Sequence, residues 1–141
     1  MIGKTYEESV IQGKAYRLLR ARVRDVLAPY NISPPEWSVI GLLVENGEMY
    51  QFEIGEYLSV EPPLVTNMIN AMEKKGLIHK KVSVKDARRK CIELTSEAAR
   101  KVPEIEKRVN DEMKEIFGDL GQEKIKVYFE VLDHIIKRVE K

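Results

Sequence analysis

Basic side chains crowd into one short stretch of this chain, between residues 74 and 90. The stretch holds eight Lys or Arg residues and a single acid, Asp86, which gives it a net charge of +7. Because the whole chain has a net charge of +1, the remainder sums to −6, and residues 31–73 contain seven Glu but no Lys or Arg. Such a cationic segment is typical of a phosphate-binding surface, although an ordinary solvated face gives the same pattern.

Side chains suited to catalysis or metal binding are sparse and scattered. The two histidines, His79 and His134, lie in different parts of the chain, and no His, Cys or carboxylate pair has the spacing of a metal site. No glycine-rich loop is present to hold nucleotide phosphates. We therefore expect no enzymatic activity, no catalytic residue, no cofactor and no metal.

Cys91 is the only cysteine, which excludes an intramolecular disulfide. A lone cysteine in a strand is usually a small packing residue. The Lys and Arg residues near it in sequence would lower its pKa, and this keeps a redox-sensing role as the alternative.

Length and composition fit a small packed domain. The chain has 141 residues, of which 43% are hydrophobic, enough for a core and too many for a disordered chain. No apolar run approaches the roughly 18 to 20 residues that cross a bilayer, and charges at Lys4, Glu7 and Glu8 interrupt any secretory signal. We expect a cytoplasmic protein with no membrane partner.

Helical signals fill the first half of the chain. Apolar residues recur at helical spacing over about 6–28. Ser33 and Glu36 have the spacing of a capping box and predict the start of a second helix, which Gly47 ends.

Two shorter helices follow, and then the periodicity changes. We expect helices at about 51–58 and from Glu61 to just before Gly76, joined by a tight turn as in a helix-turn-helix. Beyond Gly76 the apolar residues alternate with a period of two on both sides of a polar tip at 83–89, which predicts a two-stranded hairpin. A helix-turn-helix followed by such a hairpin is a winged helix.

The final third reads as two helices. Thr95 is a suitable N-cap for a helix that runs to about Phe117. The last helix has apolar residues at alternating steps of three and four, a narrow seam suited to a partner helix. These residues are Ile125, Tyr128, Leu132, Ile135 and Val139.

The fold class is therefore mainly α with a small β-wing (α+β). We expect a winged helix-turn-helix DNA-binding domain at 31–96 and a helical dimerisation region formed by 1–30 and 97–141 in one intertwined chain.

This architecture gives the basic stretch a mechanism. The second helix of a helix-turn-helix lies in the major groove, where Asn67 can pair with adenine and Thr66 can bond a phosphate or touch a thymine methyl. An arginine at the wing tip can enter the minor groove, with Asp86 holding Arg88 in position. The predicted DNA-binding residues are Pro62, Thr66, Asn67, Asn70, Lys74, Lys80, Lys81, Lys85, Asp86, Arg88, Arg89 and Lys90.

Three segments of the predicted helix-turn-helix resemble those of the MarR family of winged helix-turn-helix regulators. They are Ile54–Val60, Val65–Thr66 and Met72–Ile78, and the wing run Asp86–Lys90 with the following Leu94–Thr95 also fits the family. The resemblance covers essentially the whole chain. It implies an obligate homodimer, built by the first, fifth and sixth helices, on a pseudo-palindromic duplex with half-sites about 34–36 Å apart.

The resemblance also implies an effector. Many members release DNA when a small, often aromatic and anionic compound binds between the dimerisation and DNA-binding parts. By position, Tyr16, Arg20, Tyr30 and Trp37 would line such a pocket, with Trp37 alternatively a core residue.

Some residues depart from the family pattern. Glu61 replaces a small capping residue and would face phosphates, Tyr50 replaces a capping Thr, and Asn67 replaces a commonly basic residue. The first helix has no cysteine, which argues against peroxide sensing.

Two functions remain open. The first is a ligand-responsive repressor that binds operator DNA as a homodimer. The alternative is a winged-helix dimer used for protein contacts with weak or no DNA binding, because the helix at 62–74 has no positive charge before Lys74.

Overall fold

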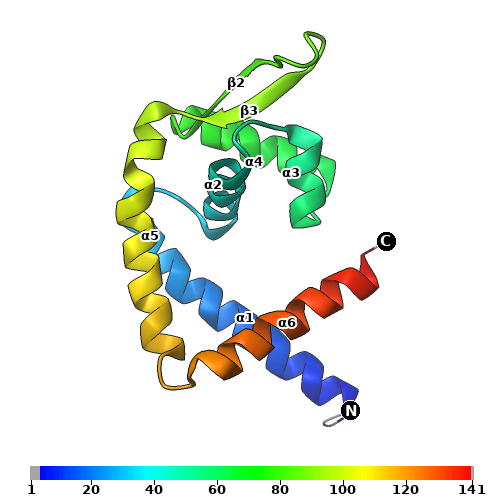
Figure 1. The fold of residues 1–141 in the computed structure, drawn as a ribbon, viewed down its shortest axis with the longest axis vertical. Helices are drawn as coiled ribbons and strands as arrows, with labels where there is room; N and C mark the ends of the chain where they lie inside the picture. Colours follow the sequence, from blue (N-terminus) through cyan, green and yellow to red (C-terminus); the bar gives the residue numbers. More distant parts are fainter. Residues whose placement is uncertain (1–3, 141) are drawn as a thin grey trace.

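The computed structural model describes residues 4–140. It confirms a mainly helical chain with one small antiparallel sheet (Figure 1). In chain order the elements are α1 (Thr5–Leu27), a 3-10 turn (Ala28–Tyr30), α2 (Pro34–Asn46), β1 (Met49–Tyr50), α3 (Gln51–Leu58), α4 (Pro62–Lys74), β2 (Ile78–Val82), β3 (Lys90–Leu94), α5 (Ser96–Phe117) and α6 (Gln122–Val139).

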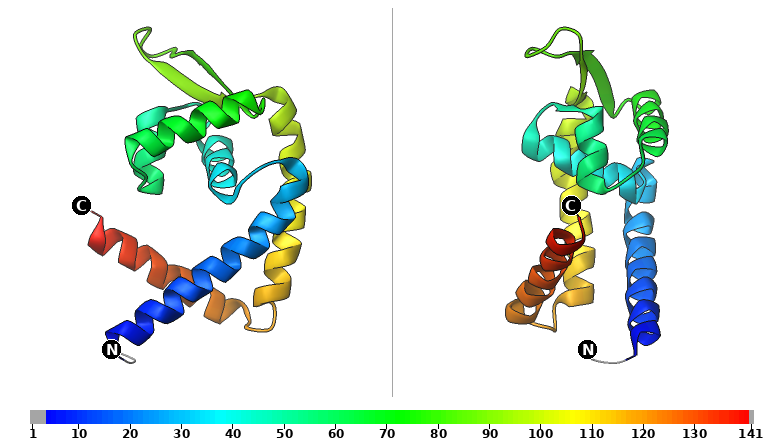
Figure 2. Two further views of the ribbon diagram at one scale, coloured as in Figure 1. Left: turned by 180° about the vertical axis from the view of Figure 1, so that it is seen from behind. Right: turned by 90° about the vertical axis from the view of Figure 1, so that its right-hand side faces the viewer.

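The elements form two parts. The sheet and α2, α3 and α4 make one cluster, and the long helices α1, α5 and α6 extend away from it (Figure 1). Although α1 and α6 cross in projection, the side view shows that they stand apart (Figure 2). None of the helices in the described chain, residues 4–140, is long and apolar enough to span a bilayer.

Local sequence signals set the predicted helix boundaries. The Ser33 backbone N–H donates to Glu36 Oε1 at 2.9 Å, and the Glu36 N–H donates to Ser33 Oγ at 3.3 Å, which confirms the capping box. The Ala98 N–H donates to Thr95 Oγ1 at 3.1 Å, which confirms the cap of α5. Gly47 ends α2 with φ at 75°, a backbone region that glycine adopts without strain.

The sheet has one strand that the sequence did not predict. Its order is β1-β3-β2, with Met49 opposite Ile92 and Tyr50 opposite Cys91. A strand of two residues is too short to show a period of two. It joins the wing to the start of α3, so the wing and the helix-turn-helix share one sheet.

The core lies under helix α4. The inner residues of α4, Val65, Ile69 and Met72, are buried. They belong to one apolar cluster with residues of α2, the sheet and α5. Burial of this stripe fixes which face of α4 is turned outward.

An ion pair ties the end of α4 to the start of α2. The Glu36 residue is only 5% exposed, and its Oε1 accepts a hydrogen bond from Lys75 Nζ at 2.8 Å. Without this partner a buried carboxylate would be left with one backbone N–H for its charge.

We therefore expect Lys75→Met to lower the free energy of unfolding by about 2 kcal/mol. Lys74→Met removes the same charge from an exposed neighbour and is expected to change it by less than about 0.5 kcal/mol. Urea unfolding followed by circular dichroism measures both variants. Equal effects would show that the Glu36–Lys75 pair has no special role in stability.

Candidate nucleic-acid interface

The helix-turn-helix depends on a close contact between α3 and α4. A Cβ placed on Gly55 would lie 3.1 Å from Val65 Cγ2 and 3.3 Å from the Val60 carbonyl oxygen, closer than most side-chain contacts. Glycine at position 55 therefore lets α4 pack against α3. The predicted DNA-binding residues of α4 are all exposed on its outer side, and these are Pro62, Thr66, Asn67, Asn70 and Lys74.

Two of these residues are hydrogen-bonded to neighbouring elements. Thr66 Oγ1 donates to the Pro62 carbonyl oxygen at 3.1 Å and accepts from Gln51 Nε2 at 2.8 Å. Asn70 Oδ1 accepts from Lys80 Nζ at 3.0 Å, and the same ammonium lies 3.9 Å from Glu73 Oε1. Lys80 therefore lies against α4 and connects this helix to the wing.

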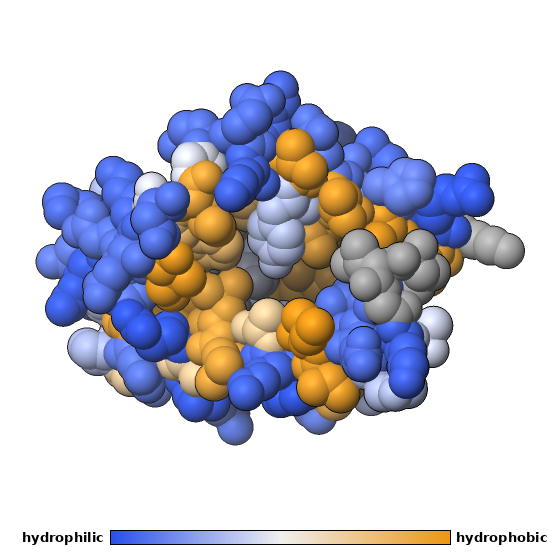
Figure 3. Space-filling model, turned by 90° about the horizontal axis from the view of Figure 1, so that it is seen from below, coloured by the Kyte–Doolittle hydropathy of each residue, from blue (hydrophilic) through white to orange (hydrophobic). Residues whose placement is uncertain are grey.

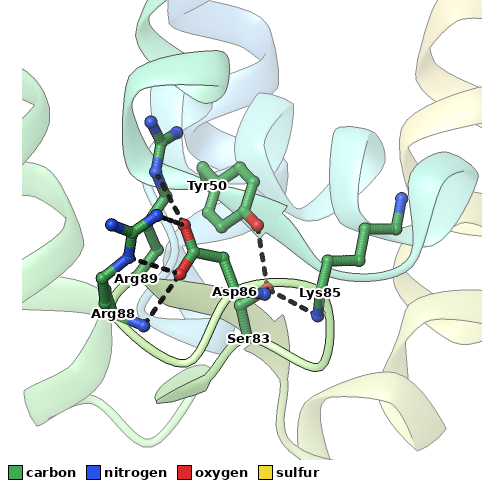
Figure 4. Close-up of polar contacts among 6 residues, drawn as sticks. All are labelled: Tyr50, Ser83, Lys85, Asp86, Arg88 and Arg89. Atoms are coloured by element: carbon green, nitrogen blue, oxygen red, sulfur yellow. Dashed lines mark hydrogen bonds and ion pairs between the residues drawn. The ribbon is translucent and has the colours of Figure 1, made fainter.

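The wing tip is organised around Asp86, as Figure 4 shows. Its Oδ1 accepts from the Arg88 backbone N–H at 3.0 Å and from Arg88 Nε at 3.1 Å, and its Oδ2 lies 3.7 Å from Arg89 Nε. Hydrogen bonds from Arg88 hold the pKa of Asp86 below its ordinary value. The predicted Asp86–Arg88 contact is confirmed, and the Arg88 side chain remains 90% exposed.

The root of the wing is held by residues that sequence reasoning missed. Ser83 is 5% exposed, and its Oγ accepts from the Lys85 and Asp86 backbone N–H groups at 3.2 and 3.3 Å. Because both lone pairs of the hydroxyl are then used, Ser83 donates to Tyr50 Oη, 2.8 Å away (Figure 4). A serine at the start of a polar tip is a turn signal, but no pattern in the sequence predicts its hydrogen bond with Tyr50.

Arg89 packs on an aromatic pair. Its guanidinium carbon lies 5.4 Å from the ring centre of Tyr50 and 5.5 Å from that of Phe52, and the two rings are stacked. Contacts of this kind are favourable by about 0.5–1 kcal/mol at exposed sites. They hold Arg89 beside the start of α3.

Lys81 has a different environment from Lys80. Its Nζ lies 2.7 Å from Glu48 Oε2 and 3.0 Å from Glu93 Oε2, and these hydrogen bonds, with Glu48 first, raise the pKa of Lys81. Glu93 also contacts His79 Nε2 at 2.6 Å. Lys80 and Lys81 are neighbours in β2 and point to opposite faces of the sheet. The ammonium of Lys81 is thus engaged within the fold and is not free to contact DNA.

Cys91 is a packing residue in β3. It is 1% exposed, and burial, followed by the charge of Glu48, raises its pKa. The expectation that nearby basic residues lower this pKa is therefore wrong, because Lys81, the cation near Cys91, is outweighed by burial and Glu48.

We expect the Cys91 thiol of the folded protein to react with a disulfide reagent at pH 7 at least about 100-fold more slowly than in denaturant. The absorbance of the released thiolate measures both rates. Fast reaction of the folded protein would reopen the redox-sensing role.

The predicted effector residues are spread over several places in one chain. Tyr16 lines an apolar groove of about 950 Å³ between α1, α5 and α6. Seen from the end of the molecule that these helices form, the surface has a hollow lined by apolar side chains (Figure 3). Tyr30 lines a cavity of about 100 Å³, and its hydroxyl accepts from Arg108 Nη1 at 3.2 Å. Arg20 is exposed on α1, and Trp37 packs against the core. A pocket formed by all four stays a prediction.

The fold and this surface define a winged helix-turn-helix protein, and comparison with known proteins places it in a family. The MarR family profile matches residues 32–90. The uncharacterized helix-turn-helix-type transcriptional regulator YwoH of Bacillus subtilis (strain 168) is 34% identical over 107 residues, which are 76% of this chain and 77% of that protein. The chain belongs to the MarR family and is a DNA-binding transcriptional regulator.

Two further relatives extend over most of the chain. The transcriptional regulator FarR of Neisseria gonorrhoeae is 29% identical over 124 residues, 88% of this chain and 85% of that protein. The crystal structure of NadR in complex with 4-hydroxyphenylacetate has a TM-score of 0.78 at 27% identity, and the match covers 97% of this chain and 96% of that one. The resemblance inferred from the sequence is thus confirmed.

Proposed function

We propose that this MarR-family regulator binds a pseudo-palindromic operator as a homodimer, represses transcription by steric exclusion, and releases DNA when a small aromatic or anionic effector binds. One observation carries the proposal. The guanidinium of Arg88 is almost fully exposed at the wing tip and is held there by Asp86, in the same winged helix as the exposed polar face of α4.

The two elements suit the two grooves of a duplex. Helix α4 presents side chains that read base edges in the major groove, and the wing presents cations that suit the narrow, electronegative minor groove and its phosphates. Asp86 and Lys80 act by positioning Arg88 and Asn70. The direct contacts that we propose are Pro62, Thr66, Asn67, Asn70, Lys74, Lys85, Arg88, Arg89 and Lys90.

The homodimer part rests on an uncovered apolar face. Exposed apolar side chains follow one another along α1 and α6, and within the described chain α6 has no buried residue. A second copy is the occupant that we propose, because both helices of the face belong to this chain and a two-fold contact is self-complementary. The face includes Val10, Ile11, Leu18, Tyr128, Phe129, Val131 and Ile135.

The effector part rests on the relative that was solved with an aromatic carboxylate. NadR is described in complex with 4-hydroxyphenylacetate, and for this chain we propose an effector of the same chemical class. Titration of the protein–operator complex with 4-hydroxyphenylacetate, and with glucose as a control, tests it by fluorescence anisotropy. We expect release of DNA by the aromatic acid alone. No release at saturating acid would contradict this effector class.

Asp86→Asn is a test in which the loss of a negative charge and the loss of Arg88 positioning predict opposite changes in DNA affinity. Removing a negative charge near DNA should strengthen binding, but we expect this variant to bind about three- to tenfold more weakly, because the amide holds Arg88 less firmly. Glu61→Gln is the matched control. It removes the same charge from the exposed N-cap of α4, and we expect it to bind more tightly. Tighter binding by both variants would show that Asp86 does not position Arg88.

Selection from a random duplex library tests the proposed function itself. We expect enrichment of an inverted repeat whose half-sites lie about one helical turn apart, bound by two chains per duplex. A library without enrichment, or an enriched single half-site bound by one chain, would overturn it.

A further inference from the structure

Hydrogen bonds within the chain engage one end of two side chains on the exposed face of α4. We propose that they preset how these residues are read by DNA: Asn70 acts as a hydrogen-bond donor and Thr66 presents its methyl group, with Lys80 and Gln51 as positioning residues. The inference rests on the proposed function, since it concerns the base contacts of the same helix.

The orientation of the Asn70 amide follows from the chemistry of its partner. Lys80 Nζ lies 3.0 Å from Asn70 Oδ1, and an ammonium group has only donors, so it must bond the amide oxygen. Glu73, 3.9 Å from the same ammonium, keeps Lys80 beside α4. The oxygen end of the amide is thus turned to the wing. The Nδ2 end has no partner among residues 4–140 and is left to the solvent.

A free amide nitrogen selects acceptors. In the major groove these are O6 and N7 of guanine and O4 of thymine. Bidentate pairing with adenine needs both ends of an amide. Asn67 has no hydrogen bond from its side chain within the described residues and keeps that option, so the two asparagines of α4 are expected to have different base preferences.

The hydroxyl of Thr66 is engaged on the inner side. Its single proton is donated to the Pro62 carbonyl oxygen, and its oxygen also accepts from Gln51 Nε2 at the start of α3. Donation to a phosphate or a base would break the first of these bonds. The methyl group is free of such constraint, and it matches the C5 methyl of thymine.

The two contacts have a defined spacing. Thr66 and Asn70 are one helical turn apart on the same face, which is about 6 Å along α4, or roughly two base-pair steps of the duplex. Each half-site is therefore expected to hold a thymine contacted by Thr66 and, about two base pairs away, a guanine or thymine contacted by Asn70.

The Thr66 contact is tested by removing the methyl group of Thr66 and the methyl group of thymine, separately and together. The full chain is titrated with the selected duplex, in which single thymines are replaced by uracil. At one position per half-site we expect uracil to weaken binding of the wild type and of Thr66→Val about three- to fourfold, whereas Thr66→Ser binds both duplexes equally. If no thymine distinguishes the wild type from Thr66→Ser, the methyl assignment is wrong.

The Asn70 contact is tested by the base preferences of three variants. The position that loses its preference in Asn70→Ala is the one contacted, and we expect guanine or thymine there in the wild type. Asn70→Asp, which offers only acceptors, is expected to shift the preference to cytosine or adenine by at least about tenfold. Lys80→Met is expected to broaden the preference, because the amide is free to rotate.

Lys85→Met is the control for charge. It also removes one wing cation and is expected to weaken binding to all sequences alike. Preference for adenine at the Asn70 position, unchanged preference in Asn70→Ala, or the same behaviour of Lys80→Met and Lys85→Met would overturn the donor assignment. Failure of the wild type to bind any duplex would instead overturn the proposed function, so the two failures are distinguishable.

Discussion

Arg88→Ala is expected to weaken binding to the operator and to unrelated duplexes by a similar factor, about 10- to 100-fold at 0.15 M salt. The guanidinium is held by Asp86 in an exposed position, so little conformational freedom is lost when it docks. A contact in the minor groove or with phosphates carries little base information. In the homodimer that we propose, two copies of the residue would contact the DNA, which increases the expected effect.

Fluorescence anisotropy at several salt concentrations measures this effect. The slope of log affinity against log salt should fall by about one for each phosphate that the variant no longer neutralises. Arg24→Ala, which removes an exposed arginine from α1, serves as the control and should leave the affinity nearly unchanged. A weaker affinity for the operator alone would mean that Arg88 reads bases, and equal binding by Arg88→Ala and the wild type would remove the wing from the interface.

Ile135→Asp is expected to separate the homodimer and to weaken operator binding by more than about 100-fold. Ile135 is 42% exposed on α6 in the apolar face that we assign to the second copy, and a carboxylate buried there would have no partner. A monomer holds one half-site only, so it loses the gain that comes from tethering two binding units.

Sedimentation velocity measures the assembly directly. The wild type should sediment with roughly twice the 16.3 kDa mass of one chain, and Ile135→Asp with the mass of one chain. Lys124→Asp adds an acid elsewhere on α6 and is expected to leave the dimer intact. A monomeric wild type, or a dimeric Ile135→Asp that still binds the operator, would contradict the proposed interface.

Features that depend on residues close in sequence were predictable. The capping box at Ser33 and Glu36 and the contact of Asp86 with Arg88 each span two or three residues, and the structure has both. The buried stripe of α4 also follows from helical periodicity, because its outer and inner faces are set by the same spacing.

Features that join distant residues were not predictable. Tyr50 and Ser83 are 33 residues apart, and the strand that brings Tyr50 to the wing has only two residues. Lys81 looked like its neighbour Lys80 in the sequence, and what distinguishes them is that Lys81 is paired with Glu48 and Glu93. The charge pattern therefore indicated the surface, and tertiary contacts decide which cations are available.

Binding of the dimer to a generic duplex, measured as salt rises from 50 to 200 mM, tests the central claim most directly. Lys74, Lys85, Arg88, Arg89 and Lys90 of two chains would together neutralise up to about ten phosphates, and the affinity should fall by about 10³- to 10⁵-fold over this range. Negligible binding at 50 mM, or an affinity that does not change with salt, would contradict a phosphate-binding surface and favour a winged-helix dimer that serves protein contacts.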